Sequence, residues 1–281
     1  MSSSSKASNT ALPETIILPR DKGLHLDLKE IWQYRELGFF LIWRTFKVRY
    51  RQTLLGVAWG FLQPLATAFT LLLVRSIVDI PTDGLHPAVF YLAGIVPWTF
   101  FVQGVQGATG SLVEHQSVIT KVYFPRIILP LSGAVAGAVD FVFGMVVLIV
   151  AMLIFDSSFG NLWGLPLFLL YAWVISIAIG MWLSSLNAIY RDIRYGLTFL
   201  LGLWMFATPI VYPLTAVSRS WRFLYDLNPL VLVIQGFRWS LTGHGVLPGT
   251  SAWISAASIL VILLTGIWFF QRAEATIVDV V

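Results

Sequence analysis

The chain has 281 residues, of which 57% are hydrophobic and 11% charged, and its mean hydropathy is +0.80. These values lie far outside the range of soluble globular proteins and predict an integral membrane protein. The net charge of +4 does not indicate nucleic acid, because nine of the 18 Lys and Arg residues precede any long apolar stretch, and the absence of cysteine excludes disulfides and thiolate metal sites.

The N-terminal segment has two parts. Residues 1–23 are Ser-rich and contain Pro, so we expect a flexible cytoplasmic tail without the apolar core of a signal peptide. Asp27, followed three residues later by Glu30, predicts the start of a helix. Residues 24–52 are therefore expected to form an amphipathic helix on the cytoplasmic membrane surface, with Trp32 toward lipid.

A cluster of basic residues with aromatic side chains between them ends this segment. The sequence from position 44 is RTFKVRYRQTLLGVAWGFLQP. No charged residue follows from Gln52 to Val74, a length sufficient to cross a hydrocarbon core of about 30 Å. Because basic residues beside a span stay in the cytoplasm, the N-terminus is expected inside and the first span runs outward.

Six largely uncharged stretches lie within residues 53–281, the expected transmembrane domain. They cover residues 54–74, 88–112, 129–155, 162–190, 195–211 and 253–270. An even number of spans places both termini in the cytoplasm, and fourteen Lys and Arg residues then lie inside. The four outside or at the outer edge are Arg75, Arg219, Arg222 and Arg238. This asymmetry supports an all-α polytopic protein with six transmembrane helices.

Two connections are long enough to hold structure of their own. Residues 111–126, expected inside, are polar, carry both charge signs and end in Tyr-Phe-Pro-Arg. Residues 213–243, expected outside, show two apolar stripes at helical spacing, and Asn228 with Pro229 marks the start of the second helix. The pattern alone is compatible with short helices that cap an exit and with a hairpin on the outer leaflet.

No catalytic group stands out in the sequence. There is no Gly-x-x-x-x-Gly-Lys-Ser/Thr motif, so we expect no ATP hydrolysis and no cofactor in this chain. The four histidines are scattered among the tail and loops. Asp140 is the only acidic residue deep in an expected span, which makes it a functional candidate. Neighbouring glycines permit close helix packing, so a structural hydrogen bond accounts for Asp140 equally well.

Several short motifs are more specific than membrane helices require. They are Tyr50-Arg51-Gln52-Thr53, Leu55-Gly56, Trp59, Gln63-Pro64, Tyr123 to Pro130, Tyr190-Arg191-Asp192, Thr208-Pro209 and Asn228-Pro229. Through them the chain resembles the membrane subunits of type-2 ABC exporters, in the branch that exports lipid-linked polysaccharides. The resemblance implies a homodimer in the bacterial inner membrane with two separate ATPase subunits that bind ATP and Mg²⁺. The implied cargo is a glycan on polyprenyl pyrophosphate, such as an O antigen, a capsule or a teichoic acid.

The resemblance also implies roles for the two long connections. Residues 111–126 resemble the cytoplasmic coupling helix, which in that family sits in a groove on the ATPase subunit. Residues 213–243 resemble the two gate helices that cap the exit on the extracytoplasmic side. The residues implied in coupling are Glu114, His115, Lys121, Tyr123, Phe124, Pro125 and Arg126.

Aromatic residues make up 15% of the chain, and many lie deep in the expected spans. Sugar rings present apolar C–H faces that stack on aromatic rings, so an aromatic conduit would let a glycan slide. For any single ring, core packing or lipid contact is the alternative. In the resembling family the conduit is formed mainly by the first, second and fifth spans, which implies lining by Trp59, Phe61, Phe69, Trp98, Phe100, Phe199, Trp204 and Tyr212.

Arg44, Lys47 and Arg51 recur on one helical face at spacings of i, i+3 and i+7. Basic side chains, Arg above all, can bind the pyrophosphate of a lipid-linked glycan at the cytoplasmic interface. Snorkelling beside the first span would explain the same residues.

Two other classes of function remain open from the sequence. A secondary carrier would need charged coupling sites in several spans, and the sequence offers only Asp140. A membrane-embedded glycan transferase would need paired carboxylates or a nucleophile facing the outer loop, where Asp226 stands alone. The exporter subunit is therefore the favoured interpretation, and it is a transport permease, not an enzyme.

Overall fold

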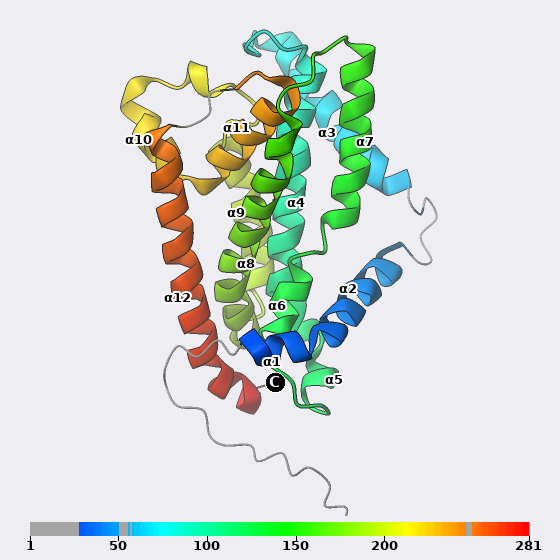
Figure 1. Ribbon diagram of the computed structural model, residues 1–281, viewed down its shortest axis with the longest axis vertical. Helices are drawn as coiled ribbons and strands as arrows, with labels where there is room; N and C mark the ends of the chain where they lie inside the picture. The colour runs from blue at the N-terminus through cyan, green and yellow to red at the C-terminus, as the bar shows by residue number, and fades with distance from the viewer. Residues whose placement is uncertain (1–27, 51–55, 57, 246–248, 281) are drawn as a thin grey trace, which may run out of the picture.

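The computed structural model describes residues 28–50, 56, 58–245 and 249–280 (Figure 1). Within these residues the chain forms helices joined by turns, which confirms the predicted all-α polytopic class. The tail 1–23 and the motif residues Arg51, Gln52, Thr53 and Leu55 lie outside the described residues.

One helix, α4 (Pro87–Glu114), lies at the centre of the bundle (Figure 1). Within its apolar stretch of 18 residues, 89% of the residues are buried. Small residues let its neighbours approach closely. A Cβ atom on Gly107 would lie 2.3 Å from the Gly133 carbonyl oxygen, and one on Gly180 would lie 2.3 Å from the Ala108 Cβ. The helices packed around α4 are α3 (Ala58–Ile77), α6 (Ile128–Gly133), α7 (Ala138–Ile154), α8 (Leu165–Ile189), α9 (Ile193–Phe206) and α11 (Pro229–Thr242).

Among the described residues, five helical segments are long and apolar enough to cross a membrane. They are Ala58–Ile77, Pro87–Glu114, Ile128–Ile154, Leu162–Ile189 and Ala252–Ala273, the last within α12 (Thr250–Val280). The stretch predicted to span residues 195–211 forms α9, which has 14 residues and a length of about 21 Å. A full span needs about 30 Å. The predicted extension to residue 211 is wrong, because Pro209 disfavours helical backbone at the residue before it.

The third predicted span is a broken helix. α6 ends at Gly133, four residues form turns, and α7 begins at Ala138. The break places a helix N-terminus inside the span, and Asp140 lies in the first turn of α7. A carboxylate is stabilised at that position by the helix dipole and by unpaired backbone N–H groups. The position of Asp140 in the sequence therefore has a structural explanation.

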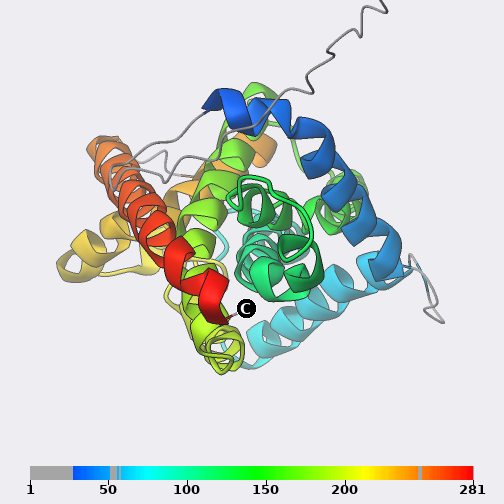
Figure 2. The same ribbon diagram turned by 90° about the horizontal axis from the view of Figure 1, so that it is seen from below.

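The two ends of the bundle differ. α1 (Leu28–Gln33), α2 (Arg35–Tyr50) and α5 (Gln116–Ile119) lie at one end, here called the α5 end, and α10 (Arg222–Leu227) lies at the other, the α10 end (Figure 1). Figure 2 shows α1 and α2 along the rim of the bundle. Leu41 of α2 is buried with Ile128 of α6, whereas Trp32 and Trp43 are exposed. This rim position suits a helix at a membrane surface.

Candidate functional site

The segment from α9 to α11 forms the most elaborate polar structure at the α10 end. After α9 the chain runs through turns and two short 3₁₀ helices, Leu214–Ala216 and Arg219–Trp221, to α10. We call residues 207–217 the exit segment. It leads through α10 into α11, where every residue except Trp239 is buried. Because α11 packs against α4, α8 and α12, it lies inside the bundle, and a surface hairpin is excluded for this helix.

Asn228 connects the end of α9 with the start of α11. Its side-chain oxygen accepts hydrogen bonds from the Leu230 backbone N–H at 3.1 Å and from the Trp204 indole N–H at 3.3 Å. Its amide donates to the Ala207 carbonyl at 3.3 Å and to the Thr208 hydroxyl at 3.2 Å. The sequence predicted the cap at the start of α11, and the structure confirms it. The bonds back to the end of α9 carried no sequence signal.

The charge count placed Arg238 of α11 outside or at the outer edge, but it did not predict that the side chain is buried among the helices. Its side chain is 2% exposed. One guanidinium nitrogen, Nη1, donates to the Pro209 carbonyl at 2.7 Å, and Nη2 donates to the Ile210 carbonyl at 2.9 Å and to the Phe90 carbonyl at 3.4 Å. The Cζ atom lies 3.7 Å from the centre of the Phe90 ring. The available signal was one charge in the otherwise apolar stripe of α11.

Two more contacts hold the exit segment farther along. The Tyr212 hydroxyl donates to the Phe206 carbonyl at 2.7 Å and pairs with the Tyr225 hydroxyl. Burial and the bond to Tyr225 raise the pKa of Tyr212, so this phenol stays protonated as a donor. The Thr215 hydroxyl donates to the Asp83 carboxylate at 2.6 Å, and this bond is exposed to solvent.

The aromatic residues predicted to line a conduit fall into two groups. Trp59, Phe69 and Phe199 have 52%, 61% and 67% of their surface exposed on the outer faces of α3 and α9. Trp98 and Phe100 are buried within the single chain, at 7% and 5% exposure. The half-buried rings are those of Phe61, Trp204 and Tyr212. The centre of the Phe61 ring lies 4.8 Å from the centre of the Phe143 ring.

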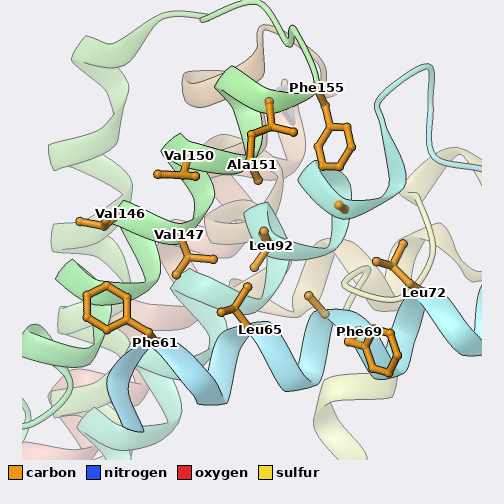
Figure 3. Close-up of a pocket in the computed structure, with 13 residues that line it drawn as sticks. Phe61, Leu65, Phe69, Leu72, Leu92, Val146, Val147, Val150, Ala151 and Phe155 are labelled. Carbon is orange, nitrogen blue, oxygen red and sulfur yellow. The ribbon is translucent and has the colours of Figure 1, made fainter. Parts of the chain in front are cut away.

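An apolar pocket of about 480 Å³ lies between α3, α4 and α7. Figure 3 shows Phe61 and Leu65 of α3 opposite Val146 and Val150 of α7. All its lining residues are apolar, whereas catalytic and small-molecule sites need a few convergent polar groups. Among the described residues, no group of His, Asp or Glu could hold a metal ion. The described geometry therefore offers no site for chemistry here.

The residues predicted to couple to an ATPase fall into exposed, half-buried and buried groups. Glu114, at the end of α4, forms a 3.1 Å ion pair with Arg194 at the start of α9, and both side chains are at least half exposed. Lys121 and Tyr123 are exposed, and Arg126 is half-buried. His115, half-buried, has Nδ1 2.9 Å from the Ser111 carbonyl, and Phe124 and Pro125 are buried. Phe124 packs with Leu41 and Leu112, so it anchors the loop that presents Tyr123.

Two basic residues of α2 point away from the bundle: Arg44 and Lys47 are exposed one turn apart. Arg51, the third residue of the predicted set, lies outside the described residues.

The described residues thus form a polytopic helical bundle with a broken third segment, a buried helix α11 and an exposed loop at the opposite end. The chain belongs to the ABC-2 type transporter family, whose profile matches residues 36–242. This finding confirms the family expected from the motifs.

The chain is similar to three curated proteins named O-antigen export system permease protein RfbA. To the protein from Myxococcus xanthus it is 29% identical over 250 residues, which cover 84% of this chain and 92% of that protein. To two proteins from Klebsiella pneumoniae it is 26% and 25% identical. These alignments cover 69% and 82% of this chain and 76% and 89% of the two relatives.

Proposed function

We propose that the chain is the permease subunit of an ATP-driven exporter that moves a lipid-linked O antigen across the bacterial inner membrane. The observation that carries the proposal is the similarity to O-antigen export permeases over most of the chain and over most of each relative. The absence of a P-loop motif in the sequence supports a separate ATPase subunit, and two copies of the permease would pair with two of them.

The proposed orientation places the α5 end in the cytoplasm. Lys121, Arg191 and Arg194 are exposed on the loops and helix starts of that end, whereas Arg219 lies beside α10. The positive-inside rule favours this arrangement. Both termini would then be cytoplasmic.

The proposed path runs between two copies of the chain. α3 and α9 have mostly exposed faces. A Cβ atom added at Gly196 or Gly202 of α9 would have no other atom within 4 Å, so this face of α9 is uncovered in the single chain. The exposed rings Trp59, Phe69 and Phe199 lie on these faces, where stacking would let successive sugars slide. Arg44 and Lys47 would receive the pyrophosphate at the cytoplasmic side. ATP binding in the partner would move the coupling segment and separate the two halves.

The first test is co-purification of the chain with the ATPase subunit encoded beside it. A variant with Glu114→Ala, Lys121→Ala and Tyr123→Ala removes the three most exposed coupling side chains. We expect it to bind the ATPase about tenfold more weakly than wild type, because truncating a few central interface residues costs about 1–2 kcal/mol. Binding is measured from the ATPase retained at a series of concentrations.

The matched control is Arg219→Ala with Ser220→Ala and Thr215→Ala, three exposed residues at the α10 end. This control is expected to retain the ATPase. If both variants retain the ATPase subunit equally, the contact with the ATPase lies outside residues 111–126. If wild-type chain binds no ATPase while its dimer is intact, the exporter proposal loses its energy source and a carrier that uses Asp140 becomes the hypothesis to examine.

A further inference from the structure

Arg238 is a cation buried in the interior of a membrane protein, where an unsatisfied charge is very costly. Within the part of the chain that the structure describes, no carboxylate lies within ion-pair distance of it. Three backbone carbonyls and the face of the Phe90 ring surround the guanidinium instead. Because carbonyl dipoles and an aromatic face both favour a cation, these groups stabilise the charge at short range, and the Asp83 carboxylate adds a longer-range attraction without a direct ion pair.

Two of the three carbonyls belong to the first part of the exit segment. Pro209 and Ile210 lie in the turn after α9, which ends at Phe206, so their carbonyl groups are outside the helix hydrogen bonds and need other donors. The guanidinium, with its several N–H groups, supplies them. The third carbonyl, that of Phe90, belongs to α4. Arg238 therefore connects α11, α4 and the turn after α9 through a single side chain.

A glycine on α4 makes room for this connection. A Cβ atom on Gly94 would lie 3.0 Å from Arg238 Nη2 and 3.2 Å from the Cγ2 atom of Ile210. Both distances are shorter than ordinary packing contacts. The absence of a side chain at this position thus permits both the guanidinium and the exit segment to sit against α4.

The other end of the exit segment is held differently. Thr215 makes one exposed hydrogen bond to Asp83, and Asp83 lies in the connection between α3 and α4. An exposed bond exchanges with water at little cost, whereas the Arg238 contacts are buried and have no water to replace them. The exit segment is thus tightly held at Pro209 and Ile210 and loosely held at Thr215.

We propose that Arg238 is the positioning residue that fixes the start of the exit segment on α4 and α11, so that the segment opens only at its far end, where Thr215 parts from Asp83. The anchor is a property of this chain alone. The cargo that passes when the far end opens rests on the proposed function.

The anchor is tested by cysteine labelling of the assembled complex in membranes. The chain has no native cysteine, so a single introduced thiol reports one position. Ile210→Cys replaces a side chain with 0% exposure. We expect a water-soluble maleimide to leave it unmodified when Arg238 is present and to label it about tenfold faster or more when Arg238→Met is added. Arg238→Lys, which keeps the charge but not the two-pronged donor, should lie between the two.

Ser176→Cys is the fold control, because Ser176 is fully buried between α4 and α8 and far from Arg238 in the chain. Faster labelling of Ile210→Cys with Ser176→Cys still protected supports the anchor. Protection of both thiols in Arg238→Met overturns it. If Ser176→Cys also becomes reactive, Arg238→Lys decides, because it keeps the charge and most of the volume: the anchor requires faster labelling of Ile210→Cys in that variant with Ser176→Cys protected.

The opening is tested by a reversible cross-link between Asp83→Cys and Thr215→Cys, whose native side chains are in hydrogen-bond contact. We expect oxidation to stop export and a reductant to restore it. Unchanged export with the cross-link formed overturns the opening at this end. Because labelling of Ile210→Cys needs no cargo, failure of the export proposal alone would leave the labelling result intact.

Discussion

Gly133→Val is expected to prevent the membrane domain from folding. A Cβ atom on Gly133 would lie 2.4 Å from the Gly107 carbonyl oxygen and 2.7 Å from its carbonyl carbon. These are backbone atoms of the central helix, which cannot move aside as the end of a flexible side chain can. Separating α6 from α4 would cost more than the 1–3 kcal/mol typical of an overpacked core, a large part of a total stability of about 5–15 kcal/mol. The measurement is the monodisperse fraction after detergent extraction and its melting temperature.

Gly196→Val is the matched control for this experiment. It adds the same side chain to a glycine of another apolar helix, α9, where nothing lies within 4 Å of the Cβ position. We expect its monodisperse fraction and melting temperature to stay close to wild type. Equal loss in both variants would show that valine itself, through its β-branched side chain, is the cause. Equal tolerance would mean that α4 and α6 do not pack as closely as the structure shows.

The predictions that succeeded rested on properties local in sequence. Long uncharged stretches were found because crossing hydrocarbon demands about 20 apolar residues, and five such helices are present in the described residues. The cap at Asn228 was predictable because an N-cap side chain bonds a backbone N–H two residues later. The end of α9 before Pro209 was missed although its signal was also local, since the residue before proline avoids helical backbone. The apolar residues on both sides of Pro209 led to a predicted stretch that was too long.

The features that the sequence did not predict depend on neighbours distant in sequence. The burial of Arg238 is one, because the carbonyls that satisfy its guanidinium come from the turn after α9 and from α4. Likewise, the sequence of α7 does not reveal that Asp140 lies in the first turn of a helix. That follows only from the break at residues 134–137, where the glycines of α4 and α6 meet. Aromatic content also did not separate Trp98, which is buried, from Phe199, which is exposed.

Arg44→Glu combined with Lys47→Glu is expected to reduce export by more than about tenfold without releasing the ATPase subunit. In the proposed mechanism these exposed side chains of α2 receive a pyrophosphate that carries several negative charges. Reversing both charges removes two attractions and adds two repulsions, each worth about 0.5–1 kcal/mol at an exposed site. The loss should be seen both in surface O antigen of cells that carry the variant and in the concentration of lipid-linked glycan that half-stimulates ATP hydrolysis.

The control variant, Lys29→Glu with Arg35→Glu, changes the charge of the same N-terminal segment by the same amount, but at positions on α1 and at the start of α2. If Arg44 and Lys47 serve only to orient the first span, both variants should weaken insertion equally, because orientation depends on the number of basic residues near a span and not on one face. A phosphate site instead requires export to fall in the Arg44 and Lys47 variant and to stay within about twofold of wild type in the control. Higher ionic strength should reduce the difference in export between the two variants, since salt screens the attraction between exposed charges.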